Sequence, residues 1–191
     1  YNSSDGKDDY VGVAGEGFFA GEVQVEQASA ASSYIPTTTA AVTRNADVLS
    51  YDTANWYADG QAGTIISDSE LISREANQYG FIWQLYKNEP NRIQVNADYV
   101  NNSYSFKVKV DGVMGVTAIN PTAITNGSAT RNAAAFETNN FASVSQGGSV
   151  AIEVSGAMPT GITTLRIGSY LQDTSWLNGC LLNVIYYQKR L

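Results

Sequence analysis

Residues 104–113, YSFKVKVDGV, decide how this chain is expected to fold. Apolar and polar side chains alternate along the first seven of them, which is the period of a β-strand with one buried face. Facing one way are Tyr104, Phe106, Val108 and Val110, and facing the other way are Ser105, Lys107 and Lys109. Asp111-Gly112 follows, a dipeptide favoured by the type I′ hairpin turn, so a return strand is expected from Val113. The stretch predicts an antiparallel hairpin with its apolar side chains in a core.

The same signals recur on both sides of this hairpin. Further strands are expected at residues 47–51, 63–70, 79–87, 92–97, 149–154, 163–167 and 177–187. Short strands at regular spacing, separated by turn residues, are typical of an antiparallel β-sandwich. The last strand is apolar on both faces, so we expect it to be central or covered, and only residues 69–78 could form a short helix. No alternation of strands and helices indicates a nucleotide-binding α/β domain.

Composition excludes several functional classes. The chain of 191 residues is 43% hydrophobic, which suffices for a core, and its net charge of −7 argues against nucleic-acid binding. It contains no histidine, which removes Ser/His and Cys/His hydrolases and His-liganded zinc sites. A single cysteine, Cys180, excludes an internal disulfide. No apolar run approaches the length of a membrane span, so no membrane partner is expected.

Three segments resemble a known group of phage proteins. They are SYIPTTTAAVTRNADVL (33–49), RNAAAFETNNFASVSQGGSV (131–150) and TTLRIGSYLQDTSWLNGCLLNVIYYQKRL (163–191). The first resembles the connector that joins a jelly-roll module to a laminin-G or concanavalin A-like lectin domain in phage tail fibres and tailspikes. The others resemble a hairpin and the final strands of that lectin domain. The resemblance implies an all-β chain with a β segment at 1–34 that ends an upstream jelly roll, an extended linker at 35–46, and a concanavalin A-like jelly-roll sandwich at 47–191.

The resemblance also implies a function. Such a domain would be a non-enzymatic part of a phage tail fibre or spike, located in the virion, that binds host cell-surface carbohydrate. It would form a homo-oligomer, most plausibly a trimer, and contact other virion tail proteins. Two alternatives stay open: a purely structural or oligomerisation module of the tail, and a glycan-degrading enzyme. Laminin-G-like domains sometimes bind calcium, so calcium is the cofactor to consider, but no ligand set can be named.

The candidate ligand-binding residues lie near the C-terminus. Trp176 stands in a loop with Asp173 and Asn178, and Tyr170 is close in sequence. A flat aromatic ring beside short polar groups suits a sugar, because the ring contacts C–H groups while the polar groups bind hydroxyls. The alternative is a tryptophan that covers the sandwich edge or contacts another subunit. Trp83, in contrast, lies in an apolar strand and is expected in the core.

One pair of carboxylates has the spacing of a glycosidase site. Asp68 and Glu70 are two positions apart on an expected strand, so both side chains would share one face. The position two residues further on is Ile72 rather than a third carboxylate. The polar face of an amphipathic strand is the favoured explanation of the pair, and we expect no catalytic residue in this chain.

Overall fold

The computed structural model describes residues 48–72, 79–170 and 175–191, and, earlier in the chain, residues 14, 15, 17, 21, 23–25 and 34–42. The chain divides into two compact units, Tyr1–Arg44 and Asn45–Leu191. Residues 34–42 form neither helix nor strand, and the backbone N–H of Ile35 donates to Gln24 Oε1 at 2.6 Å. The β segment predicted at 1–34 falls mostly outside the described residues. Its boundaries and those of the linker at 35–46 stay predictions.

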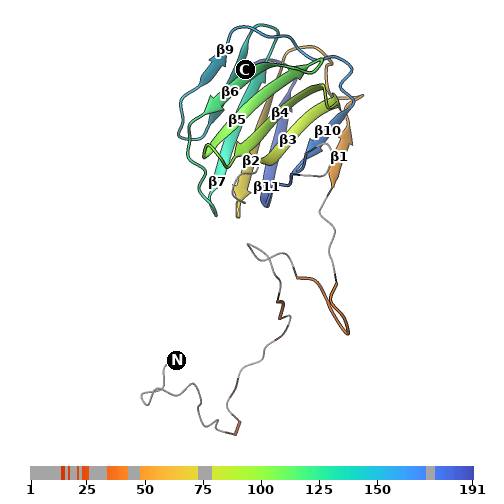
Figure 1. The fold of residues 1–191 in the computed structure, drawn as a ribbon, viewed down its shortest axis with the longest axis vertical. Helices are drawn as coiled ribbons and strands as arrows, with labels where there is room; N and C mark the ends of the chain where they lie inside the picture. Colours follow the sequence, from red (N-terminus) through yellow and green to blue (C-terminus); the bar gives the residue numbers. More distant parts are fainter. Residues whose placement is uncertain are drawn as a thin grey trace. The chain divides into compact units, whose positions relative to one another are not determined.

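The unit Asn45–Leu191 is a sandwich of two antiparallel sheets (Figure 1). The first sheet has the order β1 (Leu49–Asp52), β10 (Thr164–Ile167), β3 (Tyr79–Asn88), β4 (Asn91–Asp98), β5 (Ser103–Val110) and β6 (Val113–Asn120). The second has the order β11 (Gly179–Tyr187), β2 (Gly63–Leu71), β7 (Ala129–Phe136), β8 (Phe141–Ser145) and β9 (Ala151–Glu153). The predicted all-β antiparallel sandwich is confirmed.

Every secondary-structure element in the described residues is a β-strand, and none is a helix. Of the stretch 69–78 that could have been helical, residues 69–71 belong to β2 and residues 73–78 lie outside the described residues. Within the same described ranges, no helix has the length and apolar character needed to cross a membrane.

The hairpin predicted from residues 104–113 is β5 and β6. Asp111 and Gly112 both have positive φ, 47° and 86°, as a type I′ turn requires. Their backbone therefore matches the twist of the flanking strands. Tyr104, Phe106 and Val108 are buried between the sheets, and Lys107 and Lys109 point to the opposite side. The predicted facing of this strand is confirmed.

Aromatic and branched side chains from both sheets fill the core. Phe106 on β5 and Phe141 on β8 bring their ring centroids within 6.5 Å of each other, so this contact joins the two layers. Trp83 is fully buried, which confirms its predicted place in the core. Trp56 is half-buried at 5.3 Å from the ring of Tyr186 and donates from Nε1 to the carbonyl of Asp52.

The prediction for the last strand is wrong in one respect. β11 is an edge strand of its sheet, not a central one. A β-bulge between Leu181 and Asn183 explains its misleading pattern, because the extra residue moves the following side chains to the other face. Leu181 and Val184 pack against the core, whereas Leu182 is 57% exposed. The apolar residues beyond the bulge thus alternate out of step with those before it.

Candidate functional site

Polar side chains gather on the face of the six-stranded sheet that points away from the core. The strand register aligns one residue from each strand in a row: Ser50, Arg166, Gln84, Gln94, Lys107 and Thr117. An adjacent row contains Asp52, Thr164, Tyr86, Arg92, Lys109 and Met114. We call these two rows, together with Tyr79, Phe81 and Asn96, the polar face. Four of the chain's 11 lysines and arginines lie on it.

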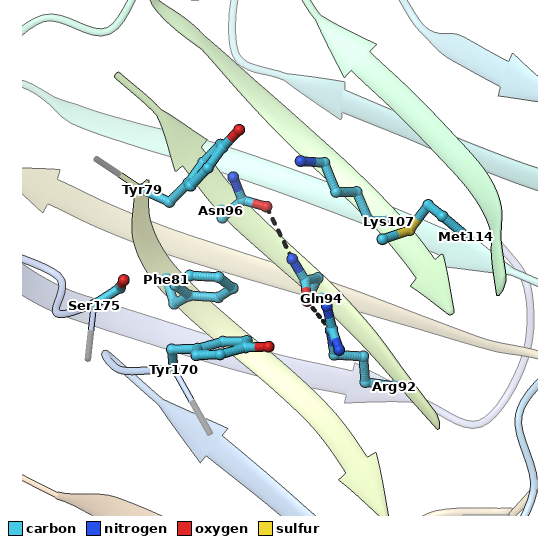
Figure 2. A pocket seen from close by; sticks show the side chains of 9 residues that line it. All are labelled: Tyr79, Phe81, Arg92, Gln94, Asn96, Lys107, Met114, Tyr170 and Ser175. Carbon is cyan, nitrogen blue, oxygen red and sulfur yellow. Dashed lines mark hydrogen bonds between the residues drawn. The ribbon is translucent and has the colours of Figure 1, made fainter. Parts of the chain in front are cut away.

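The floor of the polar face is a chain of hydrogen bonds along β4. Arg92 Nε donates to Gln94 Oε1 at 2.6 Å, and Gln94 Nε2 donates to Asn96 Oδ1 at 3.3 Å. Ser105 Oγ on β5 also donates to Asn96 Oδ1, at 3.1 Å. Figure 2 shows the two bonds that link Arg92, Gln94 and Asn96 along the strand. Because all of these residues are buried, each side chain is held in a fixed orientation.

Aromatic rings flank this floor. Phe81 and Tyr170 are packed with their ring centroids 4.7 Å apart and their planes tilted by 38°. The guanidinium of Arg92 lies 5.5 Å from the centre of the Tyr170 ring, and Lys107 Nζ lies 4.8 Å from the centre of the Tyr79 ring. Both cation–ring distances are within the range of an attractive cation–π contact. The site therefore combines flat apolar surface with fixed donors.

These side chains line an open depression of about 270 Å³ (Figure 2). Its lining residues are Tyr79, Phe81, Arg92, Gln94, Asn96, Lys107, Met114, Tyr170 and Ser175. Sites for small molecules usually measure ~300–1,000 Å³. The depression is slightly smaller than that range, which suits one ring of a sugar better than a long chain enclosed along its length.

Two carboxylates modify the charge of the polar face. Glu89 Oε1, at the turn after β3, accepts from Lys109 Nζ and Arg92 Nη1, both at 2.7 Å. These bonds lower the pKa of Glu89 to about 2, so it is ionised at neutral pH. Asp98, at the end of β4, accepts from the backbone N–H and the side-chain amide of Asn101. Burial lowers the pKa of Lys107, an effect that the charge of Asp98 opposes.

Of the four residues predicted to bind ligand, one lines the depression in the structure. Tyr170 lines the depression. Trp176 is half-buried and forms an isolated β-bridge with Ser169, and the Asn178 carbonyl accepts from the N–H of Ile72 at 2.9 Å. Neither of these two residues lines the depression, and Asp173 lies outside the described residues. A role for Trp176, Asp173 and Asn178 stays a prediction.

Sequence reasoning did not single out the floor of the depression. The sequence signal for it was the alternating series Arg92, Gln94 and Asn96, three polar side chains on one side of a strand whose other side is apolar. Such a series is also what an ordinary solvated strand face carries. The structure distinguishes the two, because β4 is buried at every one of its eight positions.

Asp68 and Glu70 lie on the outward face of the other sheet. Arg131 on the neighbouring strand binds Asp68 with two bonds, Nε to Oδ1 at 2.7 Å and Nη2 to Oδ2 at 2.9 Å. This pairing lowers the pKa of Asp68, whereas the acid of a glycosidase needs a raised one. Asp68 is therefore a poor proton donor. In the described part of the chain, no group of three acidic or cysteine side chains is placed to hold a metal ion.

No protein-family model and no curated protein match this sequence. Solved structures do match. A segment of the mouse laminin alpha1 chain with domains LG4-5 aligns with 75% of this chain at a TM-score of 0.59 and 10% identity. The alignment covers only 40% of that laminin segment. A Ruminococcus gnavus sialidase module, CBM40 bound to alpha2,3 sialyllactose, aligns with 75% of this chain and 88% of its own length, at a TM-score of 0.59 and 14% identity.

A heptameric SAP-like pentraxin from Limulus polyphemus aligns with 69% of this chain and 65% of its own, at a TM-score of 0.52 and 11% identity. The fold is a laminin G-type jelly roll. At identities this low the match concerns the fold alone, and it confirms the concanavalin A-like sandwich that the sequence predicted.

Proposed function

We propose that this laminin G-type domain is a non-enzymatic carbohydrate-binding module whose contact surface is the depression on the polar face. The observation that carries the proposal is the packed pair Phe81 and Tyr170 beside the fixed chain of Arg92, Gln94 and Asn96. A pyranose presents C–H groups on its face and hydroxyls at its rim, so it needs both kinds of surface. The solved sialidase module described as bound to sialyllactose gives the fold a precedent for such a ligand.

Rigidity of the site favours binding. The floor residues are buried and hydrogen-bonded to one another, so little side-chain freedom is lost when a sugar docks. The depression is shallow, and a single ring would make few contacts, so each site should bind weakly. Several copies on one particle would compensate, because linked sites raise the effective concentration of the ligand.

We further propose that the module belongs to a phage tail fibre or spike and contacts host cell-surface glycan. Support comes from the sequence resemblance of residues 33–49, 131–150 and 163–191 to the connector and lectin domain of such proteins. In that setting the protein would be part of the virion, would form a trimer and would adjoin other tail proteins. The pentraxin of similar fold is itself described as heptameric, so this kind of sandwich does occur in oligomers.

A glycan array tests the carbohydrate proposal. Wild-type protein should bind at least one class of sugar, and Tyr170→Ala should abolish that binding while the unfolding midpoint changes little, because Tyr170 is only half-buried. Trp176→Phe serves as the matched comparison from the loop predicted by sequence. Loss of binding in Trp176→Phe but not in Tyr170→Ala would move the contact to that loop. A wild-type protein that binds no sugar would refute the proposal.

One observation favours the structural alternative. The edge strand β11 exposes several apolar residues along its own length, among them Leu182, Ile185 and Tyr187. Exposed apolar residues of this kind often mark an oligomer contact. Light scattering of wild-type protein and of Leu182→Asp tests it. A multimer that Leu182→Asp converts to monomer, together with a negative glycan array, would make assembly the function.

A further inference from the structure

We infer that the sugar bound in the polar-face depression carries an anionic group, which lies against Lys107 and beside Arg92. This inference rests on the proposed carbohydrate function and names the class of sugar. Lys107 is the cross-strand partner of Gln94, and Arg92 is two positions from Gln94 on the same strand. Diagonal neighbours of this kind have their Cβ atoms ~7–8 Å apart, so one anionic substituent can lie within reach of both cations.

Charge is distributed unevenly over this chain. The whole protein carries −7, yet Arg92, Lys107, Lys109 and Arg166 all lie on the polar face. Among the described residues, three acidic side chains lie on or beside this face: Asp52 on β1, Glu89, which is bound to Arg92 and Lys109, and Asp98, whose charge acts on Lys107. Four cations against these three carboxylates leave the polar face with a small net positive charge on an acidic protein, and a local field of this sign favours anionic ligands.

Lys107 is the cation best placed to meet the ligand. Its ammonium lies over the ring of Tyr79 at the rim of the depression. Burial lowers the pKa of Lys107 and the charge of Arg92 adds to this effect; the charge of Asp98 acts the other way but does not restore the usual value, so the charged form of Lys107 is under-stabilised where it lies. An anion that reached the ammonium would relieve both effects. The buried amide nitrogen Nδ2 of Asn96, on the floor beneath, has no hydrogen-bond partner among the described residues, which leaves one donor of the floor unused.

The neighbouring rings restrict the ligand to a sugar rather than to a simple anion or a nucleic acid. Phe81 and Tyr170 provide a flat apolar wall directly beside Arg92, which a small inorganic anion would leave uncovered. A nucleic acid would bring a continuous line of phosphates across an acidic protein, with unfavourable repulsion outside the polar face. A single sugar ring with one negative group would cover the apolar wall and place its charge beside the cations.

The test compares acidic and neutral sugars on the same array, with uronic acids, sialic-type acids, sulfated sugars and their neutral counterparts. For the strongest acidic ligand, calorimetry then compares the sugar with its carboxyl-reduced or desulfated form. We expect the neutral form to bind about tenfold or more weakly, the range for losing one charged hydrogen bond. Binding by carboxylated sugars alone, by sulfated sugars alone, or by both identifies the source of the charge and supports the inference.

Three variants separate the role of Lys107 from general charge. Lys107→Met should lower affinity for the acidic sugar about tenfold and leave affinity for its neutral form unchanged. Lys107→Arg should restore most of the loss. Lys189→Met removes the same charge at an exposed site after β11 and should change neither affinity by more than about twofold. Thermal unfolding of each variant checks that the fold is intact.

The outcomes distinguish the two proposals. Equal affinity for acidic and neutral forms, or an effect of Lys107→Met equal to that of Lys189→Met, overturns the anionic inference and leaves carbohydrate binding standing. Binding to neutral sugars only also overturns the anionic inference and leaves carbohydrate binding standing. A blank array across every class overturns both the inference and the proposed function.

Discussion

Replacing Phe106 or Phe141 should weaken the contact that joins the two sheets. The two residues belong to different sheets, both are 0% exposed, and their ring centroids are 6.5 Å apart. Truncation of a fully buried phenylalanine to alanine costs ~3–5 kcal/mol in unfolding free energy. A domain of this kind has only ~5–15 kcal/mol in total, so alanine at both positions could unfold it. Leucine is the better probe, because it refills most of the space.

We expect Phe106→Leu and Phe141→Leu each to lower the unfolding free energy by about 1–2 kcal/mol, from the lost apolar surface and a small residual cavity. In the double variant the two losses should fall short of their sum by about 0.5–1.5 kcal/mol, the coupling of an aromatic pair. Equilibrium unfolding in urea measures all four proteins. Ile119→Ala, at a 51% exposed position on the outward side of β6, is the control and should cost less than about 0.5 kcal/mol.

Strict additivity of the two leucine substitutions would refute the contact, and single losses no larger than that of Ile119→Ala would refute the burial of these rings. Either result would mean that the sheets do not pack as a two-layer sandwich at this point.

Three other predictions concern stability. Ser67→Ala should raise the unfolding free energy, measured in urea, by about 1 kcal/mol, because the Ser67 hydroxyl is fully buried with no hydrogen-bond partner among the described residues. A lower unfolding free energy in this variant would show that the hydroxyl does have a partner. Gly179→Ala should lower the unfolding free energy by about 1–3 kcal/mol, since an added Cβ would meet the carbonyl oxygen of Glu70. Gly115→Ala is the control and should have a smaller effect, because a Cβ added there meets no atom within 4 Å. Glu89 has a folded pKa of about 2 against an ordinary value of 4.5, so its ion pairs stabilise the fold fully above about pH 4.5 and lose that effect as the pH falls towards 2. Because the carboxylate is exposed, this contribution to the unfolding free energy is limited to about 0.5–1 kcal/mol. Glu89→Gln should therefore be less stable than wild type at pH 7 and nearly as stable as wild type at pH 2. A stability difference that is the same at both pH values would contradict the assignment.

Much of the fold could be predicted because it depends on local patterns. The alternation in residues 104–110 and the Asp111-Gly112 turn specify a hairpin without reference to the rest of the chain. The position of the last strand could not be predicted in the same way. Its apolar residues are distributed over both faces by a bulge at Leu182, and a bulge leaves no simple periodic signal.

The candidate site was harder to predict for a different reason. Tyr170 was recognised as an aromatic residue in a polar segment, but Phe81 and Arg92 lie on strands far from it in sequence. Register across the sheet brings the three together, and register depends on pairings that a single sequence does not specify. An arginine on a strand is expected in solvent, whereas Arg92 is buried because Gln94 and Glu89 bind its guanidinium.

The pairing of β2 with β11 has a consequence for how the domain is made. Thr64 binds the backbone N–H of Leu191, 127 positions later, and β1 likewise pairs with the distant β10. Folding of such non-local topologies is slow, because long loops must close before their contacts form. During synthesis the sandwich cannot be completed until β11 and Leu191 have emerged from the ribosome. Strand β2 would meanwhile lack one neighbour, and any assembly that joins copies of the completed sandwich must wait until β11 has been synthesised.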